Sequence, residues 1–478
     1  MTAQYLQLSV YLLKKGTICN AVSSNPSSAI MKDKTSEAHD KIRQQFDDVI
    51  YPRISIETSP KNIPASLYIH NLVTPYYIRN KQVIDTEGKL ILDAGCGSGY
   101  TSLILAEANP GARIIGVDIS PKSIECSQER FKYHGIENFE FHVLSIEDLP
   151  QLGLEFDYIN CDEVLYLLPD PVSGLQILKS VLKPEGIIRG NFHSSLQRTN
   201  YFRAQETFKM MGLMDRNPGE FEIGIVREIM DALKDGTILK AQTWKPEKTH
   251  DEQHYFMNYF LMEDKGFTIP EVFSLFQDAE LQFISMVNWW QWNLMDLFKE
   301  SDNLPAFLGM SLPDISPEEH LKLFELLHPV HRLLDFWFGH SRQGTTSVTI
   351  DGWDDLNWQQ AIINLHPQLA TAAVEEDMRN SIAQIRPFLI NQHLPITGES
   401  CFLDSKITAC LLLLLKSAQP MEALVARYQK LYPTNPLTLE IVTKEKAEKI
   451  LRQALTQLER EGYLLIESEI STRSDIKD

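Results

Sequence analysis

The sequence predicts an α/β protein: a doubly wound parallel sheet, then an all-α middle domain and a small C-terminal domain. Between Lys89 and Ser195, short β-branched runs alternate with helical stretches, the pattern of a parallel sheet with helices on both faces. A glycine-rich turn, "DAGCGSG" from Asp93 to Gly99, follows the first run as a ligand-binding loop does in such sheets. Beyond the fifth run this alternation ends, which predicts a change of architecture.

The chain has 478 residues and 54.7 kDa, too much for one core, so we expect two or three domains. The polar segment "NAVSSNPSSAIMKDKTSEAHD" (20–40) near the N-terminus lacks the apolar residues of a core and is predicted to be part of a disordered lead-in. The predicted boundaries are 1–39 for this lead-in, 40–195 for the sheet domain, 196–386 for the helical domain and 387–478 for the C-terminal domain.

Five strands are predicted in the sheet domain, each from a short apolar run rich in β-branched or aromatic residues. The helix before the fifth strand ends at a proline and a glycine, which are common stop signals. The predicted strands are "LILDAG" (90–95), "RIIGVDI" (113–119), "FEFHVLS" (139–145), "FDYINCDEV" (156–164) and "GIIRGNFH" (186–193).

The stretch 196–386 is predicted to be helical because its apolar and aromatic residues recur at helical spacing. A tryptophan cluster in its middle is expected in a core or at a domain interface, with a cage for a methylated amine as the alternative. The cluster consists of Trp289, Trp290 and Trp292.

The last stretch reads as three helices and a strand, an order that resembles a winged-helix domain. Its charges nearly balance, and its third helical segment carries acidic residues among the basic ones. A protein-contact or structural role is therefore favoured over DNA binding.

Composition limits the partners and the compartment. The formal net charge of −19 and the pI near 5.2 argue against nucleic acid, where a basic face supplies most of the affinity. No apolar run reaches the ~20 residues of a membrane helix, so no membrane association is expected. The six cysteines are scattered without metal-ligand spacing, which favours free thiols in the cytoplasm and no metal site.

The charge of the glycine loop discriminates between ligands. A dinucleotide places its pyrophosphate against bare N–H groups at a helix N-terminus, where a nearby carboxylate would repel it. This loop has such a carboxylate, Asp93, and Tyr100 replaces the third glycine of a dinucleotide fingerprint. S-adenosylmethionine has no phosphate and carries a sulfonium and an ammonium, which a carboxylate attracts. Gly95, Gly97 and Gly99 would let the backbone approach its methionine portion.

The end of the second predicted strand supplies the other half of such a site. Asp118 can accept hydrogen bonds from both ribose hydroxyls, as a carboxylate does at this place in doubly wound sheets. Ile119 follows it and is placed to lie against the adenine. A helix-capping role for Asp118 is the alternative, but Ser120 already supplies a cap.

With these residues, the stretch 90–193 resembles the class I S-adenosylmethionine-dependent methyltransferases and their Rossmann-like sheet. "LDAGCGSG" is similar to their first motif, "GVDIS" to the acidic loop, "FDYINCDEVLYLLPDP" to the fourth motif and "LKPEGII" to the fifth. One position departs: Ser145 stands where many members have an acidic residue for the adenine amino group. The resemblance therefore implies that adenine is held by the Ser145 hydroxyl or by backbone groups at Ile146.

The whole chain also resembles larger bacterial methyltransferases with helical and winged-helix-like C-terminal domains, some of which modify protein side chains, lysine among them. The phycobiliprotein asparagine methyltransferases of cyanobacteria are a further candidate. The NPPY motif of other asparagine and glutamine enzymes is not matched, because the corresponding place reads "NCDEV".

The methyl acceptor is expected beyond the ends of the fourth and fifth strands, at the carboxyl edge of the sheet. Asp162 and Glu163 could orient an amine or accept its proton, and His193 could serve as a base. Structural roles remain open for each of them, such as capping or a solvated strand end. Asn160, Tyr166 and Asn191 lie at the same edge.

The segment before the first strand offers two further cofactor residues. Tyr77 could cover the sulfonium through a cation–π contact, and Arg79 could pair with the cofactor carboxylate. Aromatic packing of a helix on the sheet is the alternative. "HDEQH" (250–254) has the spacing of a metal pair but no third ligand, so a polar helix start is favoured.

These features predict a methyltransferase that acts on a protein side chain of lysine or asparagine type, and a homodimer is the expected assembly. A small-molecule acceptor is the first alternative, with the helical domain as a lid over it. A non-catalytic regulator that only binds the cofactor is the second.

Overall fold

The computed structural model describes residues 43–47, 50–248, 251–300, 303–341, 349–397, 400–435 and 437–468. The predicted lead-in, 1–39, lies outside the described residues. Because no structure is given there, the expectation of disorder for that stretch stays a prediction.

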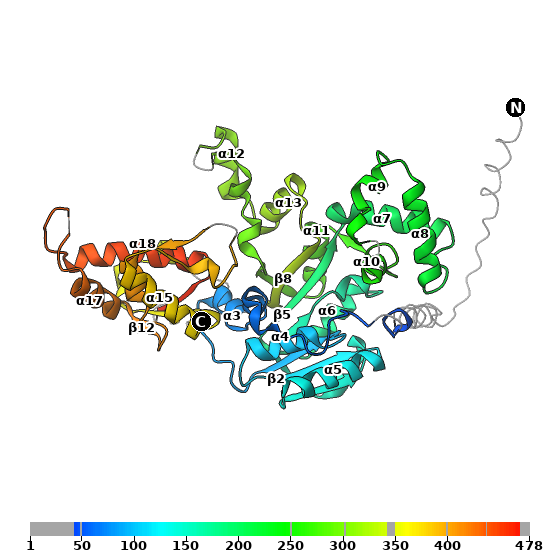
Figure 1. Cartoon of the computed structure of the whole chain (residues 1–478), viewed down its shortest axis with the longest axis horizontal. Helices are drawn as coiled ribbons and strands as arrows, with labels where there is room; N and C mark the ends of the chain where they lie inside the picture. The colour runs from blue at the N-terminus through cyan, green and yellow to red at the C-terminus, as the bar shows by residue number, and fades with distance from the viewer. Residues whose placement is uncertain are drawn as a thin grey trace, which may run out of the picture. The chain divides into compact units, whose positions relative to one another are not determined.

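In the described part of the chain, a central sheet of eight strands forms the main core (Figure 1). Seven strands follow the order β3-β2-β1-β4-β5-β8-β7, and β6 pairs with the end of β5. Strands β1 to β5 are parallel, whereas β8 is antiparallel to β5 and β7. The strands are β1 (Leu90–Ala94), β2 (Arg113–Asp118), β3 (Phe139–Val143), β4 (Phe156–Cys161), β5 (Leu182–Ser194), β6 (Gly266–Phe267), β7 (Leu281–Met286) and β8 (Leu333–His340).

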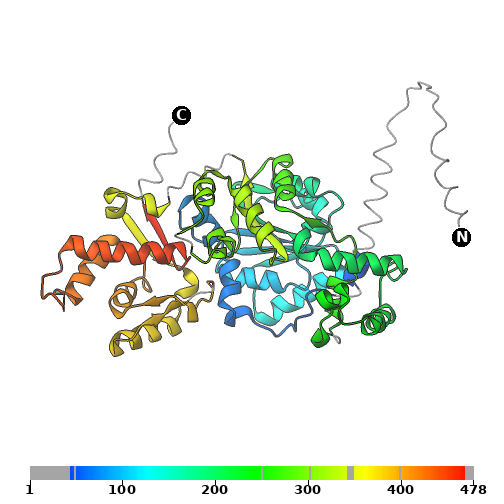
Figure 2. The same ribbon diagram turned by 90° about the horizontal axis from the view of Figure 1, so that it is seen from above.

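The doubly wound α/β class is confirmed, and the five predicted strands correspond to β1 to β5. Alternate residues of each strand face opposite sides, as in Ile91 and Leu92 of β1, which belong to two different cores. Helices α3, α4 and α5 cover one face, and α6, α11 and α13 cover the other (Figure 2). These helices are α3 (Val73–Asn80), α4 (Tyr100–Ala108), α5 (Pro121–His134), α6 (Pro171–Ser180), α11 (Ile269–Asp278) and α13 (Pro317–Leu327); α2 (Pro64–Ile69) precedes α3.

The expectation of an all-α middle domain is wrong, because β6, β7, β8 and β9 lie within 196–386. β7 and β8 complete the main sheet, and β8 pairs with β5 across the predicted boundary at 195. The run "LLDFWFGH" forms β8 within the stretch predicted to be helical, because a strand buried on both faces shows no alternation of polar residues. Helix α13 ends at Leu327, and Pro329 helps to prevent its continuation into β8.

Four helices after β5 form a separate helical group with its own apolar core (Figure 1). Phe208, Val226, Met230 and Tyr259 are fully buried there. The group returns the chain to β6 and so stands next to the end of β5. Its helices are α7 (Ser195–Met210), α8 (Glu220–Ala232), α9 (Ile238–Thr243) and α10 (Glu252–Asn258).

The C-terminal lobe contains a small antiparallel sheet in the order β12-β9-β13, and α18 lies next to β13 (Figure 2). The predicted order of three helices and a strand is present as α16, α17, α18 and β13. The central strand β9 comes from before the predicted boundary at 386, and the winged-helix assignment stays a prediction. Helix α12 (Ala306–Ser311) is not part of this lobe, since it precedes α13 and its Leu308 packs against the main core. The elements of the lobe are α14 (Asp355–Gln359), β9 (Ala361–Leu365), α15 (Ala372–Gln384), β10 (Phe388–Leu389), β11 (Phe402–Leu403), α16 (Ser405–Leu411), β12 (Gln419–Pro420), α17 (Met421–Leu431), α18 (Lys444–Arg460) and β13 (Leu464–Ser468).

The place of β8 inside the main sheet can be tested at Trp337. Its side chain is 0% exposed, and its Nε1 donates a hydrogen bond to the hydroxyl of Tyr158 on β4 at 3.1 Å. We expect Trp337→Ala to lower the free energy of unfolding by about 3–5 kcal/mol, because it leaves a large cavity. Urea denaturation followed by circular dichroism measures this loss. Phe307→Ala, at a site that is 80% exposed, should lower the free energy of unfolding by under about 0.5 kcal/mol. Equal urea midpoints for the two variants would contradict the burial of β8 in the core.

Candidate functional site

The glycine loop between β1 and α4 has the backbone that only glycine adopts readily. Gly95, Gly97 and Gly99 have φ angles of +83°, +51° and +74°. A Cβ on Gly99 would lie 2.7 Å from the Cβ of Ser127 in α5, and one on Gly97 would collide with the carbonyl oxygen of Tyr51. The loop is therefore tightly enclosed on the sides of α5 and Tyr51.

Asp93, at the end of β1, is buried beneath this loop. Ser102 Oγ donates to Asp93 Oδ2 at 2.5 Å, and Asn160 Nδ2 donates to Oδ1 at 2.8 Å. Burial raises the pKa of Asp93 to about 6, although both hydrogen bonds favour the carboxylate. A nearby cation would therefore be strongly attracted to the ionised form of this carboxylate.

Asp118, at the end of β2, is bonded to the glycine loop. Its Oδ2 accepts from Gly97 N at 2.9 Å and its Oδ1 accepts from Ser120 N at 2.8 Å. Burial raises its pKa despite these bonds. Each oxygen has a second lone pair, so the carboxylate can still accept from hydroxyls. Ile119 is half-buried beside it and packs on the core.

Ser145 and Ile146 lie just after β3, at the same edge of the sheet as Asp118. The Ser145 hydroxyl donates to Asp148 Oδ2 at 3.1 Å, and Ser145 precedes the 3-10 helix Ile146–Leu152. The Ile146 side chain is buried in the main core, so it is the backbone of this residue that can face a ligand.

A segment that sequence reasoning did not single out crosses the glycine loop. The carbonyl oxygen of Tyr51 accepts from Ser98 N at 2.9 Å, and the Tyr51 hydroxyl reaches Glu163 Oε2 at 3.3 Å. Arg130 of α5 holds this segment by donating to the carbonyls of Ser98, Ile54 and Ser55. Tyr51 thus contacts both the glycine loop and Glu163 at the end of β4. Its place in an aromatic, proline-broken stretch was the only signal in the sequence.

At the ends of β4 and β5 a buried polar network surrounds Asp162. Asn191 Nδ2 donates to Asp162, and Arg189 Nη2 lies 3.8 Å from its Oδ1. Burial opposes ionisation of Asp162, but Arg189, His70 and Asn191 outweigh it, so its pKa is lowered. Asp162 is therefore an ionised, paired carboxylate, better suited to orient groups than to accept a proton.

Glu163, the next residue, has an unusual backbone and a charged partner. Its φ is +58°, and Asn191 Oδ1 accepts from Glu163 N at 2.8 Å. Such a φ in a residue other than glycine costs of order 1–3 kcal/mol and often marks a functional site. The carboxylate forms an ion pair with Arg332 from the loop before β8, and Tyr166 Oη lies 3.4 Å from it.

His193, near the end of β5, is buried between Asp264 on one side of its ring and Arg332 on the other. Its Nδ1 lies 2.6 Å from Asp264 Oδ1, and its Nε2 lies 3.0 Å from Arg332 Nη1. The ring of Tyr166 stacks on the imidazole at 3.8 Å. Burial lowers the pKa of His193, and Arg198 and Arg332 lower it further, although Asp264 opposes them. Asp264 and Arg332 lie far from His193 in the sequence, and no motif marked them.

The structure therefore brings most of the predicted site residues to one edge of the sheet. These are Asp93, Gly95, Gly97, Gly99, Asp118, Ile119, Ser145, Ile146, Asp162, Glu163 and His193.

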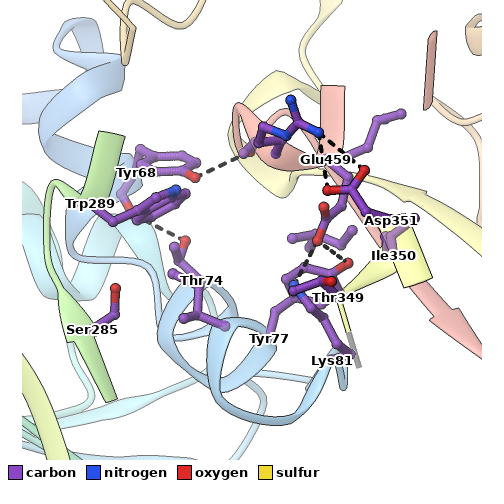
Figure 3. Close-up of a pocket in the computed structure, with 15 residues that line it drawn as sticks. Tyr68, Thr74, Tyr77, Lys81, Ser285, Trp289, Thr349, Ile350, Asp351 and Glu459 are labelled. Atoms are coloured by element: carbon purple, nitrogen blue, oxygen red, sulfur yellow. Dashed lines mark hydrogen bonds and ion pairs between the residues drawn. The ribbon is translucent and has the colours of Figure 1, made fainter. Parts of the chain in front are cut away.

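Tyr77 and Arg79 are placed elsewhere, which contradicts the prediction that they close over a cofactor. Tyr77 Oη donates to Glu459 Oε1 of α18 at 2.9 Å, and Figure 3 shows both residues at the wall of a separate cavity of about 260 Å³. Arg79 Nη1 donates to the carbonyl of Glu185 near the start of β5, the opposite edge from the glycine loop. The cause is the packing of α3, whose buried face lies on the sheet and the C-terminal lobe.

The tryptophan cluster and the "HDEQH" run have structural roles. Trp289 packs against both the main core and the core of the C-terminal lobe, as expected of an interface residue. Helix α10 starts within "HDEQH", with Asp251 as its cap, while His250 lies outside the described residues. Among the residues with described positions, no three His, Cys, Asp or Glu side chains are arranged to hold a metal ion. Within the same ranges, every helix is too short or too polar to span a bilayer.

Two family models match parts of the chain. Residues 85–260 match the family described as "Methyltransferase domain". Residues 23–145 match the family described as "Protein-L-isoaspartate(D-aspartate) O-methyltransferase (PCMT)". The first match spans β1 to β5 and reaches the end of the helical group that contains α7 to α10.

Two curated relatives are each similar to part of the chain. A protein of Synechococcus sp. without an assigned activity is 31% identical over 257 residues, covering 52% of this chain and 60% of that protein. A ubiquinone biosynthesis O-methyltransferase of Actinobacillus pleuropneumoniae is 35% identical over 117 residues, covering 23% of this chain and 47% of that protein. The chain thus spans about half to three-fifths of the length of these relatives.

A solved structure shares the fold over most of the chain. It is PKMT2 from Rickettsia typhi in complex with AdoHcy, which superposes with a TM-score of 0.54 at 18% identity. The likeness covers 84% of this chain and 76% of that one, so the shared fold includes much of the region beyond β5.

The role of Asp93 predicts a pH dependence of cofactor binding. Its carboxylate is ionised above about pH 6 and would then attract the positive charges of S-adenosylmethionine. Below pH 6 binding must displace a proton, so we expect the affinity to fall by about tenfold per pH unit. Isothermal titration calorimetry between pH 5 and 8 measures this fall.

The loss of cofactor affinity at low pH can be distinguished from acid unfolding. Because the pKa of Asp93 is higher in the folded protein than in the unfolded chain, lowering the pH through 6 favours folding at this residue. Asp93→Asn should bind weakly without the pH dependence, whereas Tyr77→Phe should bind like the wild type. A flat affinity between pH 5 and 8 in the wild type would contradict a role for Asp93 beside the cofactor.

Proposed function

We propose that this chain, whose residues 85–260 form a class I S-adenosylmethionine-dependent methyltransferase domain, transfers a methyl group to a protein side chain. The acceptor would bind at the ends of β4 and β5, beside Glu163 and His193. A lysine or an asparagine is the favoured type of side chain.

The observation that carries this proposal is the shared edge of the sheet. The glycine loop, Asp93 and Asp118 lie at the ends of β1 and β2, and Glu163 and His193 lie at the ends of β4 and β5. Methyl transfer from a sulfonium is an in-line displacement, so donor and acceptor must meet in one water-poor place. Tyr51, which contacts both the loop and Glu163, covers that place.

The size of the neighbouring cavity supports a side chain as acceptor. A cavity of about 280 Å³ lies next to Arg332 and Tyr51 and is lined on its other side by α10. Pockets for whole small molecules are typically about 300–1,000 Å³, so this one suits a single side chain of a larger molecule. Residues 196–478 also far exceed what a small-molecule pocket needs, and one matching family, over residues 23–145, is a protein methyltransferase family.

Two other functions remain as alternatives. The similarity to a ubiquinone biosynthesis O-methyltransferase favours a small-molecule acceptor. A regulator that binds the cofactor without catalysis would keep the glycine loop but need no acceptor site. The homodimer expected from the sequence stays a prediction.

Incubation of the protein with methyl-tritiated S-adenosylmethionine and a cell extract separates these functions. We expect label in a protein band after electrophoresis, with mass spectrometry to locate the modified side chain. Label only in low-mass material would establish a small-molecule acceptor. Cofactor binding without any transfer would favour the regulator.

Single substitutions test the acceptor edge. We expect Asp162→Asn, Glu163→Gln and His193→Ala each to lower the rate of label transfer while the affinity for S-adenosylmethionine is unchanged, because none of the three lies in the glycine loop. Glu375→Gln, on the exposed surface of α15, is the matched control. Full rates in all three variants would place the acceptor site elsewhere.

A further inference from the structure

We propose that His193 and Asp264 act as a pair in proton removal from the acceptor. His193 Nε2 receives the proton, and Asp264 is a positioning residue that fixes the imidazole. This inference rests on the proposed methyl transfer and adds a property of the substrate: the acceptor atom is a nitrogen or oxygen that carries a hydrogen when it binds.

The first observation is the way Asp264 is held. Both His193 and Asp264 have side chains that are 0% exposed, and their Nδ1–Oδ1 distance is 2.6 Å. The other oxygen of Asp264 accepts from Arg198 Nη2 at 2.9 Å and from Gln205 Nε2 at 2.9 Å. A carboxylate that already has two donors on one oxygen has its other oxygen free for the Nδ1–H of His193. This arrangement assigns the proton of the neutral imidazole to Nδ1.

The second observation is the donor at the opposite nitrogen. Arg332 Nη1 lies 3.0 Å from His193 Nε2, and a guanidinium can only donate. Nε2 must therefore carry a lone pair. Arg332 also lines the cavity of about 280 Å³ beside Tyr51, and its side chain is 38% exposed. A ligand in the cavity can therefore reach the position from which Arg332 donates to Nε2. An N–H or O–H of an acceptor in the cavity can take the place that the guanidinium occupies.

The third observation is the charge around the imidazole. Arg198 and Arg332 face it from two sides, Asp264 and Glu163 are each paired with one of these cations, and Tyr166 stacks on the ring. Burial and the two cations disfavour an imidazolium in the resting protein, while Asp264 stabilises the charge that forms after proton uptake. A neutral base that can become charged is thus prepared before the acceptor binds.

The step balances with the methyl transfer. The acceptor atom gives its proton to Nε2 and uses its electron pair to form the bond to the methyl carbon, while the bond from sulfur to that carbon breaks. The products are the methylated acceptor, S-adenosylhomocysteine and a protonated His193, which then loses its proton to solvent. An acceptor without a hydrogen on the reacting atom would need no such pair.

The tautomer can be measured without any acceptor. In protein labelled with ¹⁵N-histidine, the signals that disappear in His193→Gln belong to this residue. We expect a protonated Nδ1 and an unprotonated Nε2 at pH 7, and a changed tautomer ratio in Asp264→Asn. An imidazolium or a protonated Nε2 in the wild type at pH 7 would overturn the proposal.

The rate of label transfer to extract protein tests the chemistry. We expect His193→Gln to lower the initial rate by about 10²- to 10⁴-fold, the range for removal of a general base. Asp264→Asn should lower it by about 10- to 100-fold, as loss of a partner that orients an imidazole does in metal sites. Both should keep the wild-type affinity for S-adenosylmethionine. The matched control is Asp235→Asn, which changes an exposed aspartate in the helical group that contains α7 to α10.

The pH profile distinguishes positioning from a merely structural role. The rate should fall as the pH drops through the lowered pKa of His193, because a protonated imidazole accepts no proton. Asp264 raises that pKa, so Asp264→Asn should move this fall to lower pH while also lowering the plateau. Wild-type rate and profile in both variants would refute the pair. No transfer by the wild type itself would refute the proposed function, and the tautomer measurement would still decide the pair.

Discussion

The buried guanidinium of Arg189 ties together the parts of the molecule that form the site. It forms two hydrogen bonds to Asp335 of β8, lies beside Asp162 after β4, and contacts His70 before α3. It also reaches Asn160 of β4. Removal of one partner from such a network leaves an unpaired buried charge, at a cost of about 3–5 kcal/mol. These polar groups can all be paired only when β4, β5, β8 and the segment before α3 are in place.

The network around Arg189 lies beside two sets of groups at one edge of the sheet. One set surrounds the glycine loop, and the other surrounds Glu163 and His193. Beside the loop of left-handed glycines lie two carboxylates, the buried Asp93 and the half-buried Asp118. Glu163 and His193, at the ends of β4 and β5, share Arg332 as a common partner. The left-handed backbone of Glu163, held by Asn191, is what turns its carboxylate toward Arg332 and Tyr51. The left-handed backbone of Glu163 is therefore linked to its contacts with Arg332 and Tyr51.

The donor side could be predicted because its parts are close in the sequence. Asp93, the three glycines and Asp118 belong to one strand–loop–helix–strand unit, so their spacing alone fixed their meeting at the ends of β1 and β2. Tyr77 and Arg79 were wrongly assigned because the sequence shows that α3 is amphipathic but not which edge of the sheet its residues approach. The strand β8 was missed because both of its faces are buried, which removes the alternation that identifies a strand. The strand β7 is a short strand at the end of the sheet, and its middle residues are only half-buried.

The sequence by itself determined the class of sheet and the methyl donor, because both depend on local periodicity and on a short motif whose charges select a sulfonium. Only the tertiary structure decided which side chains lie beside Glu163 and His193. Tyr51, Asp264 and Arg332 come from segments far apart in the chain, and none lies in a recognisable motif. They converge on Glu163 and His193 because buried charges must be paired, and the partners that pair them are set by how the strands and the helical group pack together.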